Sequence, residues 1–248
     1  MSTKDNFSTN SDLYKQFRPN YPVALFEFIE SKLTSTDCAW DCGTGNGQIA
    51  QHLQSIFTTI HATDISQKQI DCAEISDNIE YSVQPAEKTN FTPSLFDLII
   101  VGQAIHWFDF NAFYAEVNRT AKNNALLVVT GYGKLQINNK IDAVIDYLYT
   151  EILGKYWDKE RKYIDENYTT IPFPFAEIDC PKFENTYQWT FEHLMGYLNT
   201  WSAVKHYIQQ NQSNPIDLVY NQLRSSWEKE EIKTVHFPLL LRMGRISK

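Results

Sequence analysis

The chain has 248 residues, of which 43% are hydrophobic and 14% aromatic, and its formal charge is −8. One α/β domain of this size can bury a sizeable core, and the acidic balance argues against nucleic acid as a partner because no Lys/Arg cluster would collect phosphates. No apolar run approaches the roughly 20 residues of a membrane span, and the four cysteines lack a paired metal-binding spacing. We therefore expect a single domain over 1–248, soluble and cytoplasmic with free thiols, monomeric or weakly dimeric, and without a metal site or a membrane contact.

The first expected elements are an extended segment and a helix. Residues 14–22 read Tyr-x-x-x-Arg-Pro-x-Tyr-Pro, in which Tyr14, Arg18 and Tyr21 are the side chains of interest. The two prolines hold this segment extended, and the second can open a helix over 23–32. On the residues alone, Arg18 fits a structural salt bridge in a rigid surface strap as well as it fits a ligand contact.

Residues 39–48 predict a buried strand that runs through a glycine turn into a helix. Gly43, Gly45 and Gly47 alternate, which lets the backbone turn sharply and lets a ligand lie against bare main chain. Asp41 precedes the glycines, where a carboxylate would repel a pyrophosphate but could hold an amino group, directly or through water. A dinucleotide fingerprint needs its third glycine at the position of Gln48, so the spacing disfavours a nicotinamide or flavin ligand.

Strands and helices then alternate as far as residue 133. A strand over 60–63 ends in Asp64, about 20 residues after the first glycine, where a carboxylate meets a ribose diol in this architecture. The next elements are a helix over 67–75, strands over 79–83 and 95–101, a helix over 113–121 and a strand over 125–130. The apolar run of 95–101 is typical of a central parallel strand. The pattern predicts a doubly wound sheet.

The alternation ends after the fifth strand. Apolar residues recur at helical spacing within 138–157, a charged helix is expected over 158–167, and two prolines exclude a helix over 171–175. A strand over 182–190, helices over 191–200, 202–210 and 215–230, and a last strand within 234–246 are expected after it. Candidate pocket residues within 138–167 are Tyr147, Tyr149, Tyr156, Trp157, Arg161, Lys162 and Tyr163.

The glycine turn, Asp41 and the spaced Asp64 together resemble the class I S-adenosylmethionine-dependent methyltransferases. The segment of residues 14–22 and the segment 102–108, which contains His-Trp, resemble the type 11, trans-aconitate methyltransferase-like group of that class. The resemblance implies a Rossmann-like, seven-stranded sheet in the order 3-2-1-4-5-7-6, with strand 7 antiparallel and strands 6 and 7 forming a hairpin. It also implies an N-terminal lid segment and first helix over 1–35, and a helical insertion over 134–180 that caps the substrate.

The same resemblance assigns roles to individual residues. Arg18 would meet the carboxylate of the cofactor, and Tyr14 or Tyr21 would face its sulfonium, because an Arg fork suits a carboxylate and a ring face suits a cation. His106 is the expected general base or orienting donor near the transferred methyl group. The full cofactor set comprises Tyr14, Arg18, Tyr21, Asp41, Gly43, Thr44, Gly45, Gly47, Asp64, Ile65, Ala86, Glu87, Gly102, Gln103 and Trp107.

We therefore expect methyl transfer from S-adenosyl-L-methionine to a small-molecule acceptor, and the resemblance favours a small acid such as trans-aconitate. Two alternatives remain open. One is a catalytically silent, cofactor-binding protein of the same fold, and the other is an NAD-dependent oxidoreductase, against which Gln48 and Asp41 argue. On the residues alone, segment 84–88 fits an ordinary strand-to-helix turn, and His106 fits an ordinary loop histidine.

Overall fold

The computed structural model describes residues 16–228 and 230–248, and its main element is a seven-stranded sheet in the order β3-β2-β1-β4-β5-β9-β6. The first five strands run parallel, whereas β9 is antiparallel to β5 and β6 is antiparallel to β9. The predicted Rossmann-like fold is confirmed, with β9 in the place of the expected antiparallel strand 7. The strands are β1 (Cys38–Cys42), β2 (Thr59–Asp64), β3 (Ile79–Val83), β4 (Phe96–Gly102), β5 (Ala121–Tyr132), β6 (Ala176–Glu177) and β9 (Leu239–Arg245).

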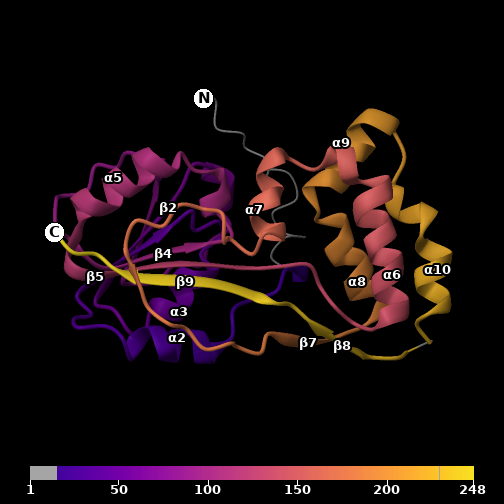
Figure 1. The fold of residues 1–248 in the computed structure, drawn as a ribbon, viewed down its shortest axis with the longest axis horizontal. Helices are drawn as coiled ribbons and strands as arrows, with labels where there is room; N and C mark the ends of the chain where they lie inside the picture. Colours follow the sequence, from indigo (N-terminus) through magenta and orange to yellow (C-terminus); the bar gives the residue numbers. More distant parts are fainter. Residues whose placement is uncertain (1–15, 229) are drawn as a thin grey trace.

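Helices cover both faces of the sheet, and the period of two along each strand separates two hydrophobic cores. In β4, Leu98 and Ile100 pack into the core that contains α2 (Val23–Glu30) and α3 (Gln48–Leu53). Ile99 and Val101 pack into the opposite core with Trp40 and with residues of α5 (Phe110–Thr120). Figure 1 shows α5 on one side of the sheet and α2 and α3 on the other. The short helix α4 (Gln67–Ile70) follows β2.

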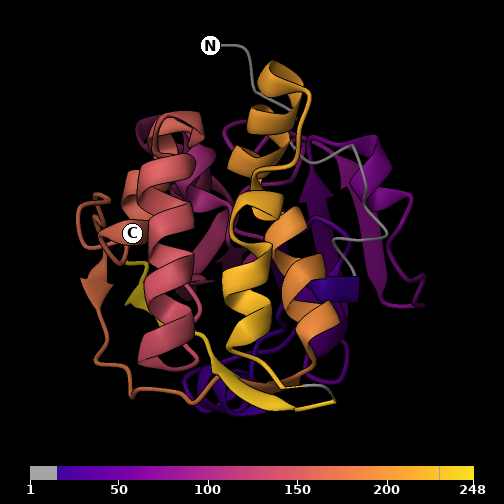
Figure 2. The same ribbon diagram turned by 90° about the vertical axis from the view of Figure 1, so that its right-hand side faces the viewer.

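A second group of helices lies beyond one end of the sheet, and we call α6, α8, α9 and α10 the helical layer (Figures 1 and 2). It draws on two stretches of chain on either side of β6, so it contains more than residues 134–180. The assignment of that insertion as a substrate cap stays a prediction. The elements are α6 (Asn139–Tyr147), α7 (Lys162–Asp165), α8 (Phe191–Asn199), α9 (Ser202–Asn211) and α10 (Tyr220–Ser225).

The expected helix within 138–157 is interrupted: α6 passes into a π-helical turn, Leu148–Ile152, and a 3-10 turn, Gly154–Tyr156. A further 3-10 turn, Lys159–Arg161, precedes α7. The region expected as one helix over 215–230 begins with the 3-10 turn Pro215–Leu218 and ends with α10. Because of these short turns, side chains that are close in sequence point in different directions, and residues 159–163 line two different cavities.

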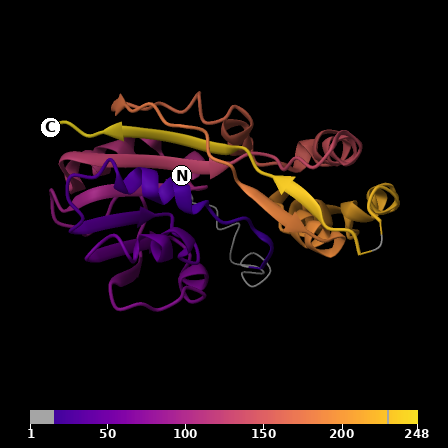
Figure 3. The ribbon, with the colours of Figure 1, turned by 90° about the horizontal axis from the view of Figure 1, so that it is seen from below.

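The expected hairpin of the sixth and seventh strands is found only in part: β6 and β9 pair antiparallel in the main sheet, but other strands and helices separate them along the chain. The strand signal of 182–190 is real, but β7 (Thr186–Trp189) pairs with β8 (Lys233–His236) in a separate two-stranded sheet. The last strand is split because Pro238 cannot donate a ladder hydrogen bond, so β8 ends before it and β9 begins after it. Figure 3 shows β9 returning from the helical layer to the main sheet. Period-two patterning identifies a strand but does not choose its partner.

None of the helices in the described residues has both the length and the apolar character needed to cross a bilayer. All four cysteines are free thiols, and Cys38 and Cys42 are buried in β1. The predicted cytoplasmic location and the predicted oligomeric state stay predictions.

Candidate active site

A cavity of about 1140 Å³ opens at the carboxyl ends of β1, β2 and β4, where a doubly wound sheet places its ligands. Its size suits a ligand of nucleoside dimensions or larger. The lining brings together most of the residues singled out from the sequence, namely Tyr21, Asp41, Gly43, Thr44, Gly45, Asp64, Ile65, Ala86, Glu87, Gly102, Gln103, His106 and Trp107. Tyr14 lies outside the described residues.

The glycine turn is built by left-handed backbone and by close packing. Gly43, Gly45 and Gly47 have φ angles of 72°, 56° and 85°, which favour glycine. A Cβ on Gly43 would lie 2.6 Å from the Cβ of Ala104, and one on Gly47 would lie 2.3 Å from Tyr81 Oη. Gly47 does not line the cavity, so its role in the structure is to form the turn and make room for Tyr81.

The Asp64 carboxylate at the end of β2 is fixed by backbone donors. Its Oδ2 accepts from the N–H of Gly45 at 2.9 Å, and its Oδ1 accepts from the N–H of Ser66 at 2.9 Å. Both donors belong to loops that border the cavity. The carboxylate is therefore held in the wall in one orientation, where a ligand diol would gain charge-assisted hydrogen bonds.

Asp41 is the most constrained acid of the site, since only 1% of its surface is exposed. Its Oδ2 accepts from Thr44 Oγ1 at 2.5 Å and from the N–H of Ala50 at 3.0 Å. Its Oδ1 is buried and has no hydrogen-bond partner within the described part of the chain. Burial raises the pKa of Asp41 to about 7. A buried carboxylate oxygen without a donor is costly, and a ligand ammonium group would meet that need.

The segment after β4 forms the wall between this cavity and a smaller one. Gln103 has a φ of 53°, and its Nε2 donates to the carbonyl oxygen of Tyr132 at 3.1 Å. His106 is 5% exposed, and its Nδ1 lies 3.3 Å from Tyr168 Oη. Burial and the nearby charge of Arg161 lower the pKa of His106 to about 3. The imidazole is therefore neutral at physiological pH, which makes it a poor general base there.

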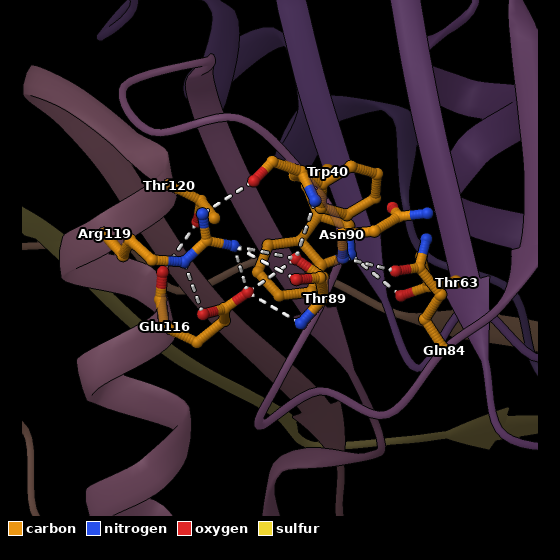
Figure 4. A network of polar contacts seen from close by, with 9 residues as sticks. Trp40, Thr63, Gln84, Thr89, Asn90, Glu116, Arg119 and Thr120 are labelled. Carbon is orange, nitrogen blue, oxygen red and sulfur yellow. Dashed lines mark hydrogen bonds and ion pairs between the residues drawn. The ribbon is translucent and has the colours of Figure 1, made fainter.

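The loop 84–91 supplies Ala86 and Glu87 to the far end of the cavity, and a polar network holds it (Figure 4). Glu116 Oε1 accepts from the N–H of Thr89 at 2.8 Å, and Arg119 bridges Glu116 Oε1 and the carbonyl oxygen of Phe91, both at 2.6 Å. Burial opposes ionisation of Glu116, but hydrogen bonds from Arg119 and Thr89 hold its pKa below the usual value.

A second set of bonds ties the two ends of this loop together and fixes its exit toward the next helix. Gln84 accepts from the N–H of Asn90 at 2.8 Å, and Glu87 accepts from the N–H of Asp109 at 3.0 Å. In the same view, Trp40 donates to Thr63 Oγ1 at 2.8 Å beneath the loop (Figure 4). The segment bordering the predicted adenine position is therefore fixed by side chains from α5 and from its own two ends.

Arg18 lies in the smaller cavity, of about 50 Å³, and not in the lining of the larger one. Its Nη2 donates to the carbonyl oxygen of Thr200 at 3.2 Å, its Nη1 lies 3.5 Å from Tyr132 Oη, and its guanidinium lies over the ring of Tyr197. The smaller cavity shares Gln103, His106 and Trp107 with the larger one and is completed by Trp157, Asp158, Arg161, Ile164 and Ser202.

Of the candidate residues from Tyr147 to Tyr163, Trp157 and Arg161 line the smaller cavity, and Lys162 and Tyr163 line the larger one. The others, Tyr147, Tyr149 and Tyr156, line neither. Sequence reasoning missed Tyr168, which is fully buried and touches both Gln103 and His106. It follows α7 in a stretch without periodicity, so no sequence signal distinguished it from the many other aromatic residues nearby.

Comparisons with known proteins agree with this geometry. A family profile described as a methyltransferase domain matches residues 40–129. The chain is 32% identical, over 97% of its length, to a protein assigned as a methyltransferase in Dictyostelium discoideum, 95% of which is covered. It is 37% identical to a solved structure assigned as a type II methyltransferase from Anaeromyxobacter dehalogenans, with a TM-score of 0.86 and coverage of 93% of this chain and 99% of that one.

A more distant structure shares the fold. It is phosphoethanolamine N-methyltransferase 2 of Haemonchus contortus, solved with phosphomonomethylethanolamine and S-adenosylhomocysteine. The identity is 17% and the TM-score 0.52, with coverage of 100% of this chain and 61% of that one.

Asp64→Ala should weaken the binding of S-adenosylhomocysteine. Loss of charge-assisted hydrogen bonds to the ribose, about 1.5–3 kcal/mol, corresponds to a roughly 10- to 150-fold rise in Kd. Isothermal titration calorimetry measures it, with Asp71→Ala as the control because Asp71 follows α4 outside both cavities. Equal affinities of the Asp64 variant and the wild type would remove Asp64 from the site.

Asp41 should make the binding of S-adenosylhomocysteine depend on pH. Its carboxylate must be ionised to meet an ammonium group, and its pKa is raised to about 7, so affinity should fall as the pH drops from 8 to 5.5. Asp41→Asn should bind weakly with a flatter profile. Methylthioadenosine lacks the α-amino group of S-adenosylhomocysteine and is therefore the control ligand. Its affinity for the wild type should not depend on pH in this way. Identical pH profiles of wild type and variant for S-adenosylhomocysteine would refute the role.

Proposed function

The chain belongs to the class I S-adenosylmethionine-dependent methyltransferases, and from that premise we propose that it methylates an oxygen of a small carboxylic acid, as the resemblance to trans-aconitate methyltransferases suggests. One observation carries the proposal. The smaller cavity adjoins the cofactor cavity through Gln103, His106 and Trp107, and two arginines, Arg18 and Arg161, line it. Among its described lining residues, Asp158 is the only acid, so the cavity suits an anion.

Arg161 is oriented for a carboxylate. Its Nε donates to Tyr149 Oη at 2.8 Å, and that hydroxyl donates to Asp165 Oδ1 at 2.7 Å. The guanidinium lies 4.9 Å from the centroid of the Trp157 ring. No described residue hydrogen-bonds to either Nη atom of Arg161. Two such N–H groups in a rigid plane match the two oxygens of a carboxylate.

The larger cavity fits S-adenosylmethionine. Asp41 Oδ1 has no hydrogen-bond partner among the described residues and could accept from an ammonium group, and Asp64 could accept from a diol. When bound, this cofactor supplies a methyl group on a sulfonium that is already an activated leaving group. Asp41 and Asp64 would hold its two ends, while Arg161 would orient the acceptor on the far side of His106. Holding the reactants in line is the main task of the site.

A carboxylate acceptor also fits the state of His106. An ionised carboxylate carries no proton, so its attack on the methyl group requires no general base. His106, with its pKa lowered to about 3, is neutral and does not offer a base near neutral pH. Burial of His106 and the cover of Trp107 and Trp157 would exclude water, which competes for the methyl group.

The acceptor class is tested with isotopically labelled S-adenosylmethionine and a small-metabolite extract, followed by mass spectrometry. We expect the label in base-labile methyl esters of small acids. Label that resists mild base, as in N-methyl or ether products, would contradict the carboxylate proposal while leaving the family assignment intact.

Arg161→Gln should raise the KM for the acid by roughly 10- to 100-fold, since a charge-assisted pair is lost. The Kd for S-adenosylhomocysteine should stay within about twofold, because Arg161 does not line the larger cavity. Arg224→Gln is the matched control, since Arg224 also stacks on a ring, that of Phe191, but lies outside both cavities. An unchanged acceptor KM in the Arg161 variant would exclude Arg161 from acceptor binding.

A further inference from the structure

We propose that Tyr168 is a positioning residue which, together with Gln103, holds neutral His106 with its proton on Nδ1 and thereby presents the Nε2 lone pair to the methyl-transfer site. The inference deepens the proposed function by assigning the state of the histidine between the two cavities. It concerns the reaction of the family and does not depend on which acceptor the smaller cavity binds.

The direction of each hydrogen bond follows from its neighbour. Gln103 Nε2 lies 3.1 Å from the carbonyl oxygen of Tyr132, which only accepts, so the amide nitrogen must be on that side. Gln103 Oε1 therefore faces Tyr168 Oη, at 3.2 Å, and accepts a hydrogen bond from its hydroxyl group. The Tyr168 oxygen is then the acceptor for His106 Nδ1 at 3.3 Å. A neutral imidazole with its proton on Nδ1 has a lone pair on Nε2.

The backbone around this chain of bonds is strained in a way that supports a functional role. Gln103, Asn167 and Tyr168 have φ angles of 53°, 53° and 60°, in the left-handed region that L residues with a side chain rarely adopt. Two of these three residues, Gln103 and Tyr168, form a hydrogen bond with each other. Tyr168 is fully buried, and its carbonyl oxygen accepts from Arg242 Nη1 at 3.2 Å.

Gly131 in β5 makes the contact between Gln103 and Tyr168 possible. A Cβ at this position would lie 2.6 Å from Gln103 Oε1 and 2.8 Å from Tyr168 Oη, closer than such atoms approach. A side chain there would separate the two oxygens and break the chain of bonds at its centre. The packing, the left-handed backbone and the absence of a Cβ at Gly131 thus all favour the contact between Gln103 and Tyr168.

A lone pair suits the location of His106. The residue lines both cavities, where the sulfonium methyl group and the acceptor must meet. A neutral Nε2 acceptor attracts that cationic methyl group, whereas an N–H at the same position would repel it. Burial and the charge of Arg161 lower the pKa of His106 to about 3, which keeps the ring from becoming an imidazolium and losing the lone pair.

The tautomer is measured by NMR on the full chain labelled with ¹⁵N-histidine, in complex with S-adenosylhomocysteine at pH 7. The His106 signals are identified by their loss in His106→Asn. We expect the coupling pattern of an Nδ1–H, Nε2-unprotonated ring. An Nε2–H ring or an imidazolium in the wild type overturns the proposal, and neither result bears on the acceptor class.

Tyr168→Phe supplies the second test. The His106 signals should shift toward the Nε2–H tautomer, and kcat should fall about tenfold, the order expected for one misplaced hydrogen bond, with the Kd for S-adenosylhomocysteine within about twofold. Tyr114→Phe is the matched control, because Tyr114 is a buried tyrosine that donates to the carbonyl oxygen of Pro172, outside the His106 contacts. A retained Nδ1–H tautomer and wild-type kcat in Tyr168→Phe would overturn the proposal. If that variant does not fold, Gly131→Ala breaks the same contact from β5, and the wild-type spectrum decides independently.

Discussion

The site depends on one buried carboxylate. Asp41 is the penultimate residue of β1, just before the glycines, and Thr44 Oγ1 and the N–H of Ala50 fix one of its oxygens. The other oxygen is buried without a hydrogen-bond partner in the described residues. In the free protein this is an electrostatic cost, and a cationic amino group removes it. The same carboxylate is unsuited to a pyrophosphate, which agrees with the family assignment and argues against the nicotinamide alternative, although the architecture is shared with dinucleotide-binding proteins.

Methyl transfer requires the cofactor and the acceptor to lie next to each other. One short segment after β4 borders both cavities. Gln103, His106 and Trp107 form a wall common to both cavities. The 3-10 turn Lys159–Arg161 contacts the 3-10 turn Ile105–Trp107, which carries His106. In the proposed function, the sheet would hold the cofactor and the segment before α7 would hold the acceptor. Acceptor choice could then change through the helical residues without altering the glycine turn.

The sheet and the cofactor side could be predicted from the sequence because their signals are local. Each signal lies within the segment whose structure it predicts. These signals are the alternating glycines, the acids at 41 and 64 and the apolar run of β4. The smaller cavity could not be predicted, because its residues meet only in three dimensions. The contacts of Arg18 with Thr200 and Tyr197, far along the chain, could not be predicted either, and its expected contact with the cofactor carboxylate stays a prediction. Tyr168 and the partner of β7 likewise depend on long-range contacts that no periodicity encodes.

A crystal structure with S-adenosylhomocysteine would show whether Asp41 and Asp64 hold the cofactor. We expect the ribose hydroxyls on Asp64, the α-amino group beside Asp41 Oδ1, directly or through one water, and the sulfur on the side of His106. A ligand bound in the reverse direction, with its adenine at His106 and its amino group away from Asp41, or bound outside this cavity, would contradict this expectation.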